Sequence, residues 1–378
     1  MNRRSSLAVL FALPLVLLAG CRSTSSTSGG GAGSQGVLLA IGGGLDDDNA
    51  PVYRRFQELA SRSGPARIVI ATAASGDEDD AEKGKRESIG AWCPGARIDA
   101  IRRGTSEAET VALIDAATAM FFTGGDQKRI TDRYRPDDRA TPEWEAVRRL
   151  LARGGVIAGT SAGDAMMGDV MFHTGQSAAA LGIRTRRPAG DGGDPETREA
   201  ETLGPQIGPG MRLVSTVLTD SHFFERNRVG RLVAALEQSG LRLGIGVGED
   251  ACVEIDLATG VATGTSVAES LLVDVGALKR EGLVRRGAVA TMLRQGASIS
   301  LNGLLEKPLA TPPARPAAAP VEVPVVEPGQ NRQLASWRLF GRASEKDGAP
   351  RRLVLNGWMI TAWAVGNGSV AFDIETTP

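Results

Sequence analysis

The sequence predicts an α/β protein: a mostly parallel β-sheet covered by helices on both faces in three layers, with a small β-rich extension at the C-terminus. Short apolar runs alternate with helix-length amphipathic segments, and the runs are continuously apolar. Strands of that kind are buried on both faces, which is typical of parallel sheets. The five clearest runs are Val37 to Ile41, Arg67 to Thr72, Ala96 to Ile101, Met120 to Phe122 and Val156 to Ala158.

Two helices are recognisable from their ends and their periodicity. Thr141 and Pro142 have the chemistry of a helix cap and first turn, and Gly154-Gly155 ends that segment. A second helix is expected from about Asn227 to Gly240, where apolar residues recur at i, i+3, i+4 and i+7. The apolar faces are formed by Trp144, Val147, Leu150 and Leu151 in the first helix and by Val229, Leu232, Val233 and Leu236 in the second.

The rest of the chain divides by composition. Further strand-like runs follow Leu243, so we expect one catalytic domain with a single core over residues 36–304. Residues 305–330 are rich in Pro and Ala and predict a stiff, extended linker. In residues 331–378, Asn356-Gly357 and the turn at 366–368 predict a three-stranded β-meander that packs on the catalytic domain or is marginally stable. Its three tryptophans favour a core or docking use over ligand binding.

The N-terminus resembles a bacterial lipoprotein signal. Residues 1–20 hold Arg3 and Arg4 before an apolar run that ends Leu18-Ala19-Gly20, directly before Cys21. The run is too short for a membrane-spanning helix, which needs about 20 residues. The resemblance implies cleavage before Cys21 and lipidation of its sulfur, with residues 21–35 as a flexible tether. We therefore expect an exported protein that is lipid-anchored to a bacterial membrane, with the outer membrane favoured, or extracellular.

Charge and cysteine usage exclude several classes of function. The chain has 43 basic and 44 acidic side chains, whereas nucleic-acid binding needs clustered basic excess. Cys93 and Cys252 lack metal-ligand spacing, so no metal site or other cofactor is expected. Two buried thiols are the favoured interpretation, with one disulfide as the alternative.

A candidate nucleophile lies at the end of the fifth apolar run. Gly159-Thr160-Ser161-Ala162-Gly163 follows a predicted strand and precedes small residues that can begin a helix. Glycine two positions before and after Ser161 permits a tight strand-to-helix turn without Cβ clashes. This context predicts a nucleophilic serine, and the alternative is a glycine-rich turn with a capping serine.

Only two histidines are available as the base. His173 lies in a Met/Phe-rich stretch and is interpreted as structural, whereas His222 follows an apolar run at the predicted carboxyl edge of the sheet. Glu249 and Asp250 follow a short strand and are candidates to orient the imidazole. On a strand they point to opposite faces, so only one is expected to reach His222.

Two backbone amides are expected to form an oxyanion hole. Ala162 follows the nucleophile directly, and Gly125 lies in the glycine pair that ends another apolar run. The Gly42-Gly43-Gly44 run lacks the pattern of a phosphate-binding loop and is interpreted as a tight turn.

These blocks resemble the cyanophycinase family of serine peptidases, relatives of aspartyl dipeptidase. The resemblance covers about Gly36 to Leu304 and rests on four blocks: Phe122-Thr123-Gly124-Gly125-Asp126-Gln127, Gly159-Thr160-Ser161-Ala162-Gly163, Asp220-Ser221-His222-Phe223 with its following arginines, and Gly246-Val247-Gly248-Glu249-Asp250. It implies that Ser161 is the nucleophile, His222 the base and Glu249 its orienter. It also implies a substrate pocket formed by Gln127, Asp220, Ser221, Arg226, Arg228 and Arg231.

Two positions depart from the family pattern. Ser221 stands where the family usually has Gln, and Asp164 stands where a small residue is usual. The stretch from Arg186 to Gly204 is insertion-like, with a surface loop as the default interpretation and a lid as the alternative.

The resemblance implies an exopeptidase that hydrolyses cyanophycin, multi-L-arginyl-poly-L-aspartate, to β-Asp-Arg dipeptides through an acyl-enzyme. The alternatives are an aspartyl or isoaspartyl dipeptidase acting on short Asp-containing peptides, which Ser221 leaves open, and a non-catalytic peptide-binding lipoprotein. A homodimer is also left open by the family resemblance.

Overall fold

The computed structural model describes residues 36–182, 205–309, 312–325, 334–345, 349–355 and 357–377. The signal-like segment, Cys21 and the tether lie outside these residues, as does the stretch from Arg186 to Gly204. No helix in the described part of the chain is both long and apolar enough to cross a membrane.

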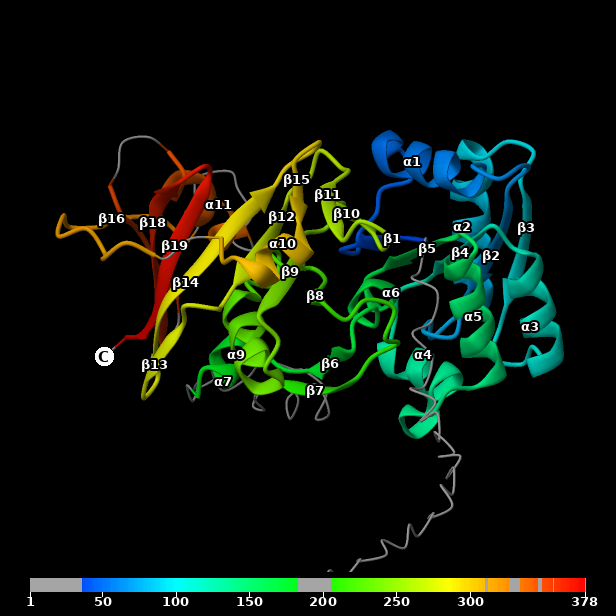
Figure 1. The fold of residues 1–378 in the computed structure, drawn as a ribbon, viewed down its shortest axis with the longest axis horizontal. Coiled ribbons are helices and arrows are strands. Elements are labelled where there is room, and N and C mark those ends of the chain that lie inside the picture. Colours follow the sequence, from blue (N-terminus) through cyan, green and yellow to red (C-terminus); the bar gives the residue numbers. More distant parts are fainter. Residues whose placement is uncertain are drawn as a thin grey trace, which may run out of the picture. The chain divides into compact units, whose positions relative to one another are not determined.

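The first sheet has eight strands in the order β15-β11-β10-β1-β5-β4-β2-β3 (Figure 1). The five predicted runs form its parallel part, and three later strands extend it in antiparallel fashion. The parallel strands are β1 (Val37–Ile41), β2 (Arg67–Ala71), β3 (Arg97–Ile101), β4 (Ala119–Phe122) and β5 (Val156–Thr160). The antiparallel strands are β10 (Cys252–Asp256), β11 (Val261–Gly264) and β15 (Ser298–Ser300).

Helices cover both faces of this sheet, as predicted. In β1, Leu39 packs in one apolar cluster with Phe56, whereas its neighbour Leu38 packs in another with Leu150. Alternate residues of a strand point to opposite faces, so the two clusters mark the two sides. One side carries α1 (Ala50–Ala60) and α2 (Glu78–Trp92). The other carries α3 (Glu107–Ala116), α4 (Gln127–Tyr134) with the short 3-10 turn η1 (Pro136–Asp138), and α5 (Pro142–Ala152).

The local signals for helix ends are confirmed. The hydroxyl of Thr141 accepts a hydrogen bond from the amide of Trp144 at 3.1 Å, and Pro142 is the first residue of α5. The second predicted helix is α9 (Val229–Ser239), which ends at Gly240 in the left-handed conformation. Cys93 and Cys252 are both buried as free thiols, which is the favoured interpretation of the sequence.

A second sheet of nine strands departs from the expected single core. Its order is β16-β17-β18-β19-β14-β12-β9-β8, with β13 paired to β14, and most neighbours are antiparallel. It contains β8 (Val217–Asp220), β9 (Leu243–Val247), β12 (Ser270–Asp274), β13 (Lys279–Glu281), β14 (Val284–Leu293), β16 (Val321–Glu322), β17 (Arg351–Leu355), β18 (Trp358–Gly366) and β19 (Ser369–Thr376).

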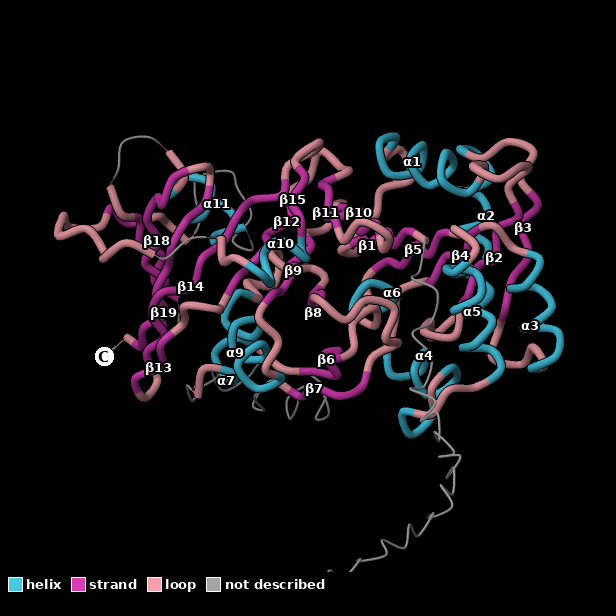
Figure 2. Tube along the Cα trace, viewed as in Figure 1, coloured by secondary structure: helices cyan, strands magenta, loops and turns pink. Residues whose placement is uncertain are grey.

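The sequence did not reveal this second sheet because its strand β12 is buried on both faces. In β12, Leu272 packs in a cluster shared with the first sheet, whereas Leu271 and Val273 pack in a separate cluster with α9. Figure 2 shows α9 next to β9. An antiparallel strand that is covered on both sides reads as a continuous apolar run, so the sequence pattern alone did not distinguish it from a parallel strand.

The C-terminal meander is confirmed as β17-β18-β19, with Leu355 opposite Trp358 in the first hairpin. It is not a separate small core, because β19 pairs with β14 and continues the second sheet. Trp358 and Trp363 are buried in it, whereas Trp337 of α11 (Ala335–Ala343) is partly exposed and donates to Glu269. The predicted linker contains β16, which pairs with β17.

Short elements complete the described chain. A two-stranded sheet is formed by β6 (Val170–Thr174) and β7 (Gln206–Pro209). The remaining helices are α6 (Ala162–Ala165), α7 (Ser177–Ala180) and α10 (Leu301–Glu306).

Candidate active site

Ser161 lies on a strained turn between β5 and α6. Its backbone has φ 54° and ψ −105°, in a region that favours glycine. A Cβ at Gly159 would lie 2.1 Å from the carbonyl oxygen of Gly163, and a Cβ at Gly163 would lie 2.6 Å from that of Phe122. Both glycines are therefore required by close backbone approach, as the sequence pattern predicts. The turn holds the hydroxyl of Ser161 out at the carboxyl edge of the sheet.

The structure brings Ser161, His222 and Glu249 together. The Ser161 Oγ lies 2.8 Å from His222 Nε2, and His222 Nδ1 lies 2.7 Å from Glu249 Oε1. His222 follows β8 and Glu249 follows β9, and these two strands are parallel neighbours. Carboxyl ends of adjacent parallel strands meet at one edge of a sheet, which is why residues 27 positions apart come into contact.

Asp250 has a structural task of its own. Its Oδ1 accepts hydrogen bonds from the amide of Asp46 at 3.0 Å and from Asn49 Nδ2 at 2.7 Å. Only one of the two acids contacts His222, as the sequence predicts, but the alternation of residues along a strand is not the reason. Glu249 and Asp250 lie in a turn between β9 and β10, where Asp250 has φ 57°, so strand alternation does not apply.

The glycine run after β1 does more than make a turn. A Cβ at Gly43 would lie 2.3 Å from His222 Cε1, and a Cβ at Gly44 would lie 3.3 Å from the Cβ of Glu249. The carbonyl of Gly42 accepts from the amide of His222 at 2.7 Å. The glycine run therefore packs against both His222 and Glu249 and helps to position them. Sequence reasoning missed this role, because the contact joins segments that are far apart in the chain.

The environment of His222 favours a neutral imidazole. Burial lowers its pKa, the hydrogen bond to Glu249 opposes that shift, and the positive charges of Arg226 and Arg228 lower the pKa further. A neutral imidazole whose Nε2 faces a serine hydroxyl can accept the hydroxyl proton. The Ser161 Oγ would then be able to attack a carbonyl carbon.

The two predicted oxyanion donors border the same pocket as Ser161. Ala162 and Gly125 both line it, and among the described residues neither amide N–H has an acceptor. Gly124 also approaches the nucleophile, since a Cβ there would lie 3.3 Å from the Cβ of Ser161. Free amides beside the nucleophile are suited to hold a developing oxyanion.

The pocket in front of Ser161 has a volume of about 260 Å³. Five of the six predicted substrate residues line it: Gln127, Ser221, Arg226, Arg228 and Arg231. Gln127 Nε2 donates to the carbonyl of Phe172 at 2.5 Å, which ties α4 to β6.

Asp220 does not line this pocket, although the family resemblance places it among the pocket residues. It is fully buried behind the pocket and accepts from Arg231 Nε at 2.8 Å and from Arg228 Nη1 at 3.3 Å. Its position at the end of a continuously buried strand explains why it cannot reach solvent. Asp220 therefore positions two arginines of the pocket wall.

The three arginines differ in what they can offer a ligand. Arg231 is held by Asp220, by the carbonyl of Gly175 at 2.8 Å and by the ring of Phe172, so it forms a fixed wall. Arg228 donates Nη1 to the carbonyl of Ser221 at 2.6 Å, and burial lowers its pKa to about 9, which leaves it cationic at neutral pH. Arg226 is exposed, and its side chain has no partner in the part of the chain that the structure describes.

The sequence favours a structural role for His173, but the structure places this residue at the pocket. Its side chain is exposed and lines the pocket together with Thr174 and Gln176. The surrounding pocket wall desolvates the imidazole in part, and this partial desolvation together with the charge of Lys128 lowers its pKa. In β6, Phe172 points inward and His173 outward, so period-two alternation was the signal that could have identified it.

Asp164, the departure noted beside the nucleophile turn, is completely buried. Neither carboxylate oxygen has a hydrogen-bond partner among the described residues. Burial raises its pKa well above the usual range, and the nearby charge of Asp220 adds to the shift.

Comparison with known proteins gives a consistent picture. A sequence model of peptidase family S51 matches residues 38–189. The chain is 31% identical over 228 residues to a cyanophycinase of Nostoc sp. and 33% identical over 225 residues to one of Trichormus variabilis. Each alignment covers 57% of this chain and 66% of the relative, so the match spans just under two thirds of the relatives' length.

A solved structure shares the fold. The crystal structure of a peptidase from an acI-B1 Actinobacterium superposes with a TM-score of 0.51 at 18% identity, covering 71% of this chain and 98% of that one.

Proposed function

Because a model of peptidase family S51 and several cyanophycinases match this chain, we propose that it is a serine-type peptidase that hydrolyses aspartyl peptides through an acyl-enzyme on Ser161. The observation that carries the proposal is the unbroken series of contacts from Ser161 through His222 to Glu249. This argues against a non-catalytic binding protein, because binding alone needs no such alignment.

The geometry supports a two-stage reaction. His222 Nε2 takes the hydroxyl proton as Ser161 Oγ attacks the scissile carbonyl, and the amides of Ala162 and Gly125 hold the resulting oxyanion. The tetrahedral intermediate collapses, His222 gives the proton to the leaving amine, and the acyl-enzyme remains. Water then attacks the ester with His222 as base, which releases the acid product and returns the proton to Ser161.

For the substrate, we propose cyanophycin, with β-Asp-Arg dipeptides as products. The curated relatives carry the name cyanophycinase. The arginines that border the pocket complement the carboxylates of such a polymer, and Arg228 can still offer Nη2 to a ligand.

A shorter substrate is the second candidate. The pocket of about 260 Å³ is small, and Ser221 replaces the longer glutamine of the family pattern. Both observations favour an aspartyl or isoaspartyl dipeptidase over an enzyme that engages many residues of a polymer.

One assay distinguishes these activities. Protein from Gly36 to Pro378 is incubated with cyanophycin granules and, separately, with α- and β-linked Asp dipeptides, and the products are identified by mass spectrometry. Release of β-Asp-Arg from granules supports the first candidate, and cleavage of dipeptides alone supports the second. Ser161→Ala and His222→Ala are each expected to abolish turnover while the protein stays folded. Substantial activity of Ser161→Ala would overturn the covalent mechanism.

We also propose that the protein is exported and lipid-anchored through Cys21. The basis is the signal-like segment in the sequence. Metabolic labelling with a fatty acid, followed by membrane fractionation, is expected to find lipid on the protein and to lose it in Cys21→Ser. Recovery of an unlipidated cytoplasmic protein would contradict the proposal.

A further inference from the structure

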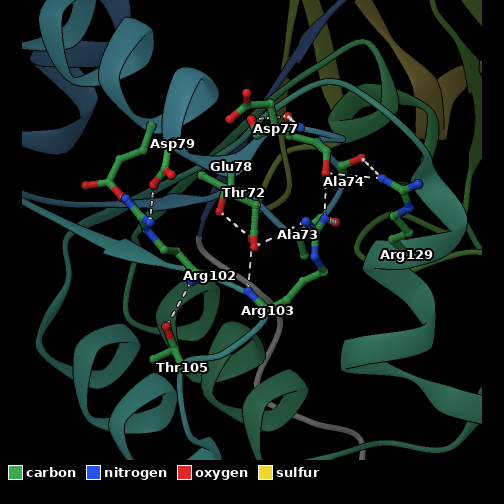
Figure 3. Close-up of polar contacts among 12 residues, drawn as sticks. Thr72, Ala73, Ala74, Asp77, Glu78, Asp79, Arg102, Arg103, Thr105 and Arg129 are labelled. Atoms are coloured by element: carbon green, nitrogen blue, oxygen red, sulfur yellow. Dashed lines mark hydrogen bonds and ion pairs between the residues drawn. The ribbon is translucent and has the colours of Figure 1, made fainter.

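We propose that Arg103 and Arg129 are positioning residues that hold the oxyanion hole in place by clamping the loop behind Gly125. This loop, residues 72–77, follows β2, and Figure 3 shows both arginines directed at its main-chain carbonyls. This inference rests on the proposed function, in which the Gly125 amide holds the oxyanion.

The loop fixes Gly125 by direct contact. A Cβ at Gly125 would lie 2.1 Å from the carbonyl oxygen of Ala74, and φ at Gly125 is 137°. The next residue, Asp126, donates its amide to that same carbonyl at 2.9 Å. Gly125 is therefore packed against Ala74, and a displacement of Ala74 moves Gly125, which lines the pocket.

Two guanidinium groups, each from a different later segment of the chain, donate hydrogen bonds to the loop. Arg103 Nη1 donates to the carbonyl of Ser75 at 2.5 Å and to that of Ala73 at 3.2 Å. Arg129 Nη1 donates to the carbonyls of Ser75 at 3.1 Å and Ala74 at 3.4 Å. The carbonyl of Ser75 thus accepts from both arginines. Such charge-assisted bonds are stronger than those between neutral groups.

Each arginine is itself anchored. The amide of Arg103 donates to Glu78 Oε1 at 2.9 Å, and its Nη2 lies 3.3 Å from Glu78 Oε2. Glu78 also accepts from the hydroxyl of Thr72 at 2.9 Å, at the start of the loop. Arg129 belongs to α4, the helix that begins immediately after Gly125 and Asp126. The clamp therefore connects the loop to the segment that carries the oxyanion donor.

Arg102 provides a matched control. It is 44% exposed, compared with 45% for Arg103 and 46% for Arg129. Its side chain binds the carboxylates of Asp79 and Glu82 and makes no bond to the loop carbonyls (Figure 3). A general effect of losing a surface arginine in this region should thus appear equally in Arg102→Gln.

The proposed role predicts a specific kinetic signature. An oxyanion hole acts in the transition state and not in substrate binding, so its displacement lowers kcat and leaves KM unchanged. Removal of an entire oxyanion donor costs about 10²- to 10³-fold in kcat. Displacement of a donor that remains present should cost less, on the order of tenfold.

The test compares Arg103→Gln, Arg129→Gln and Arg102→Gln in the otherwise unaltered chain. The readouts are kcat and KM on the peptide cleaved by the unaltered protein, and the second-order rate at which a fluorophosphonate labels Ser161. This label places a phosphoryl oxygen in the oxyanion hole and needs no knowledge of the substrate. We expect kcat and labelling to fall about tenfold in the first two variants with KM within twofold, and both readouts to stay within twofold in Arg102→Gln.

Additional variants separate a clamp from a folding defect. Arg129→Lys keeps one charged donor and should recover part of the lost labelling, with a thermal midpoint near that of the unaltered protein. The double variant should lose less than the product of the single losses, because both arginines share Ser75. Equal losses in all three glutamine variants, unchanged labelling in the first two, or a loss confined to KM would each overturn the clamp. Failure of the unaltered protein to label would overturn the proposed nucleophile and the clamp with it.

Discussion

The amide of His222 donates to the carbonyl of Gly42 at 2.7 Å, so the first β-strand's turn holds the backbone of the base. His222 comes from the second sheet and Gly42 from the first. One residue further along the glycine run, the carbonyl of Gly43 accepts from the amide of Asp250 at 2.8 Å, beside Glu249. The base and its orienter are therefore positioned by the sheet that carries the nucleophile, which links their geometry to that of Ser161.

Replacement of the buried Arg228 by lysine should lower kcat/KM more than the same replacement of the exposed Arg226. Arg228→Lys is expected to lower kcat/KM about ten- to a hundredfold, because a charged hydrogen-bond partner in a closed pocket contributes about 1.5 to 3 kcal/mol and lysine lacks the planar fork. Arg226 is exposed, so Arg226→Lys should change the activation free energy by no more than about 0.5 kcal/mol. Steady-state kinetics on the cleaved peptide measures both. Three neutral results in Arg226→Lys, Arg228→Lys and Arg231→Lys would contradict a role for the arginines in binding.

Asp220 and Arg231 should matter for stability more than for direct binding. Asp220→Asn leaves the Arg231 guanidinium buried with its main partner weakened, and breaking a buried pair in this way costs about 3 to 5 kcal/mol. Urea unfolding is expected to show this loss. The exposed pair of Lys128 and Asp132 is a control, because Asp132→Asn should lie within about 1 kcal/mol of the unaltered protein. A similar small effect for Asp220→Asn would contradict the positioning role.

The pH dependence of kcat/KM follows from the charges around His222. The base must be neutral, and its lowered pKa places the acidic limb of the profile below the ordinary histidine value near 6.5. Glu249→Gln removes the contact that raises the pKa, so the limb should move to lower pH while the plateau falls. Arg226→Gln removes a charge that lowers the pKa, so the limb should move to higher pH. Profiles of the three proteins over a range of about pH 4 to 9 provide the comparison. Shifts in the same direction for both variants would contradict this electrostatic account.

Asp164 should make stability pH-dependent. Its pKa is raised in the folded protein, so between the unfolded value near 3.9 and the folded value the native state holds a proton that the unfolded chain releases. The free energy of unfolding therefore falls as pH rises through that interval, by at most about 1.4 kcal/mol per pH unit. Asp164→Ala lacks this effect and should gain stability relative to the unaltered protein as pH increases from about 4 to 8. Urea unfolding at several pH values measures the difference. A gap that does not change with pH would exclude a buried, proton-binding Asp164.

Local patterns made part of this protein predictable. The five parallel strands, the capped helix at Thr141 and the turn around Ser161 each depend on residues that are close together in the sequence, so periodicity, caps and glycines indicated them. The positions of Ser161, His222 and Glu249 at strand ends followed from the same patterns, together with the family resemblance.

The features that were missed depend on contacts between distant segments. The second sheet was not predicted because β12 is buried on both faces, and the complete burial of Asp220 was not predicted because no local signal shows what covers a strand end. The loop behind Gly125 is held by arginines 28 and 54 positions from Ser75. No periodicity or spacing encodes such pairs, because they arise only when the tertiary structure forms.

The support of His222 by Gly43 gives the sharpest substitution test. A Cβ at Gly43 would lie 2.3 Å from His222 Cε1, so Gly43→Ala must displace the imidazole from Ser161 or shift the turn. Because a 1 Å misplacement of a catalytic group can cost about 100-fold, we expect a loss of that order in kcat. Gly43 also has φ 98°, which strains any other residue, and Gly95 is the matched control because it has φ 80° and no atom lies within 4 Å of where its Cβ would be. Gly95→Ala should lose a similar amount of stability but keep its activity. Two results would contradict this account of how His222 is positioned: full activity of a folded Gly43→Ala variant, or a loss of activity in Gly95→Ala as large as that in Gly43→Ala.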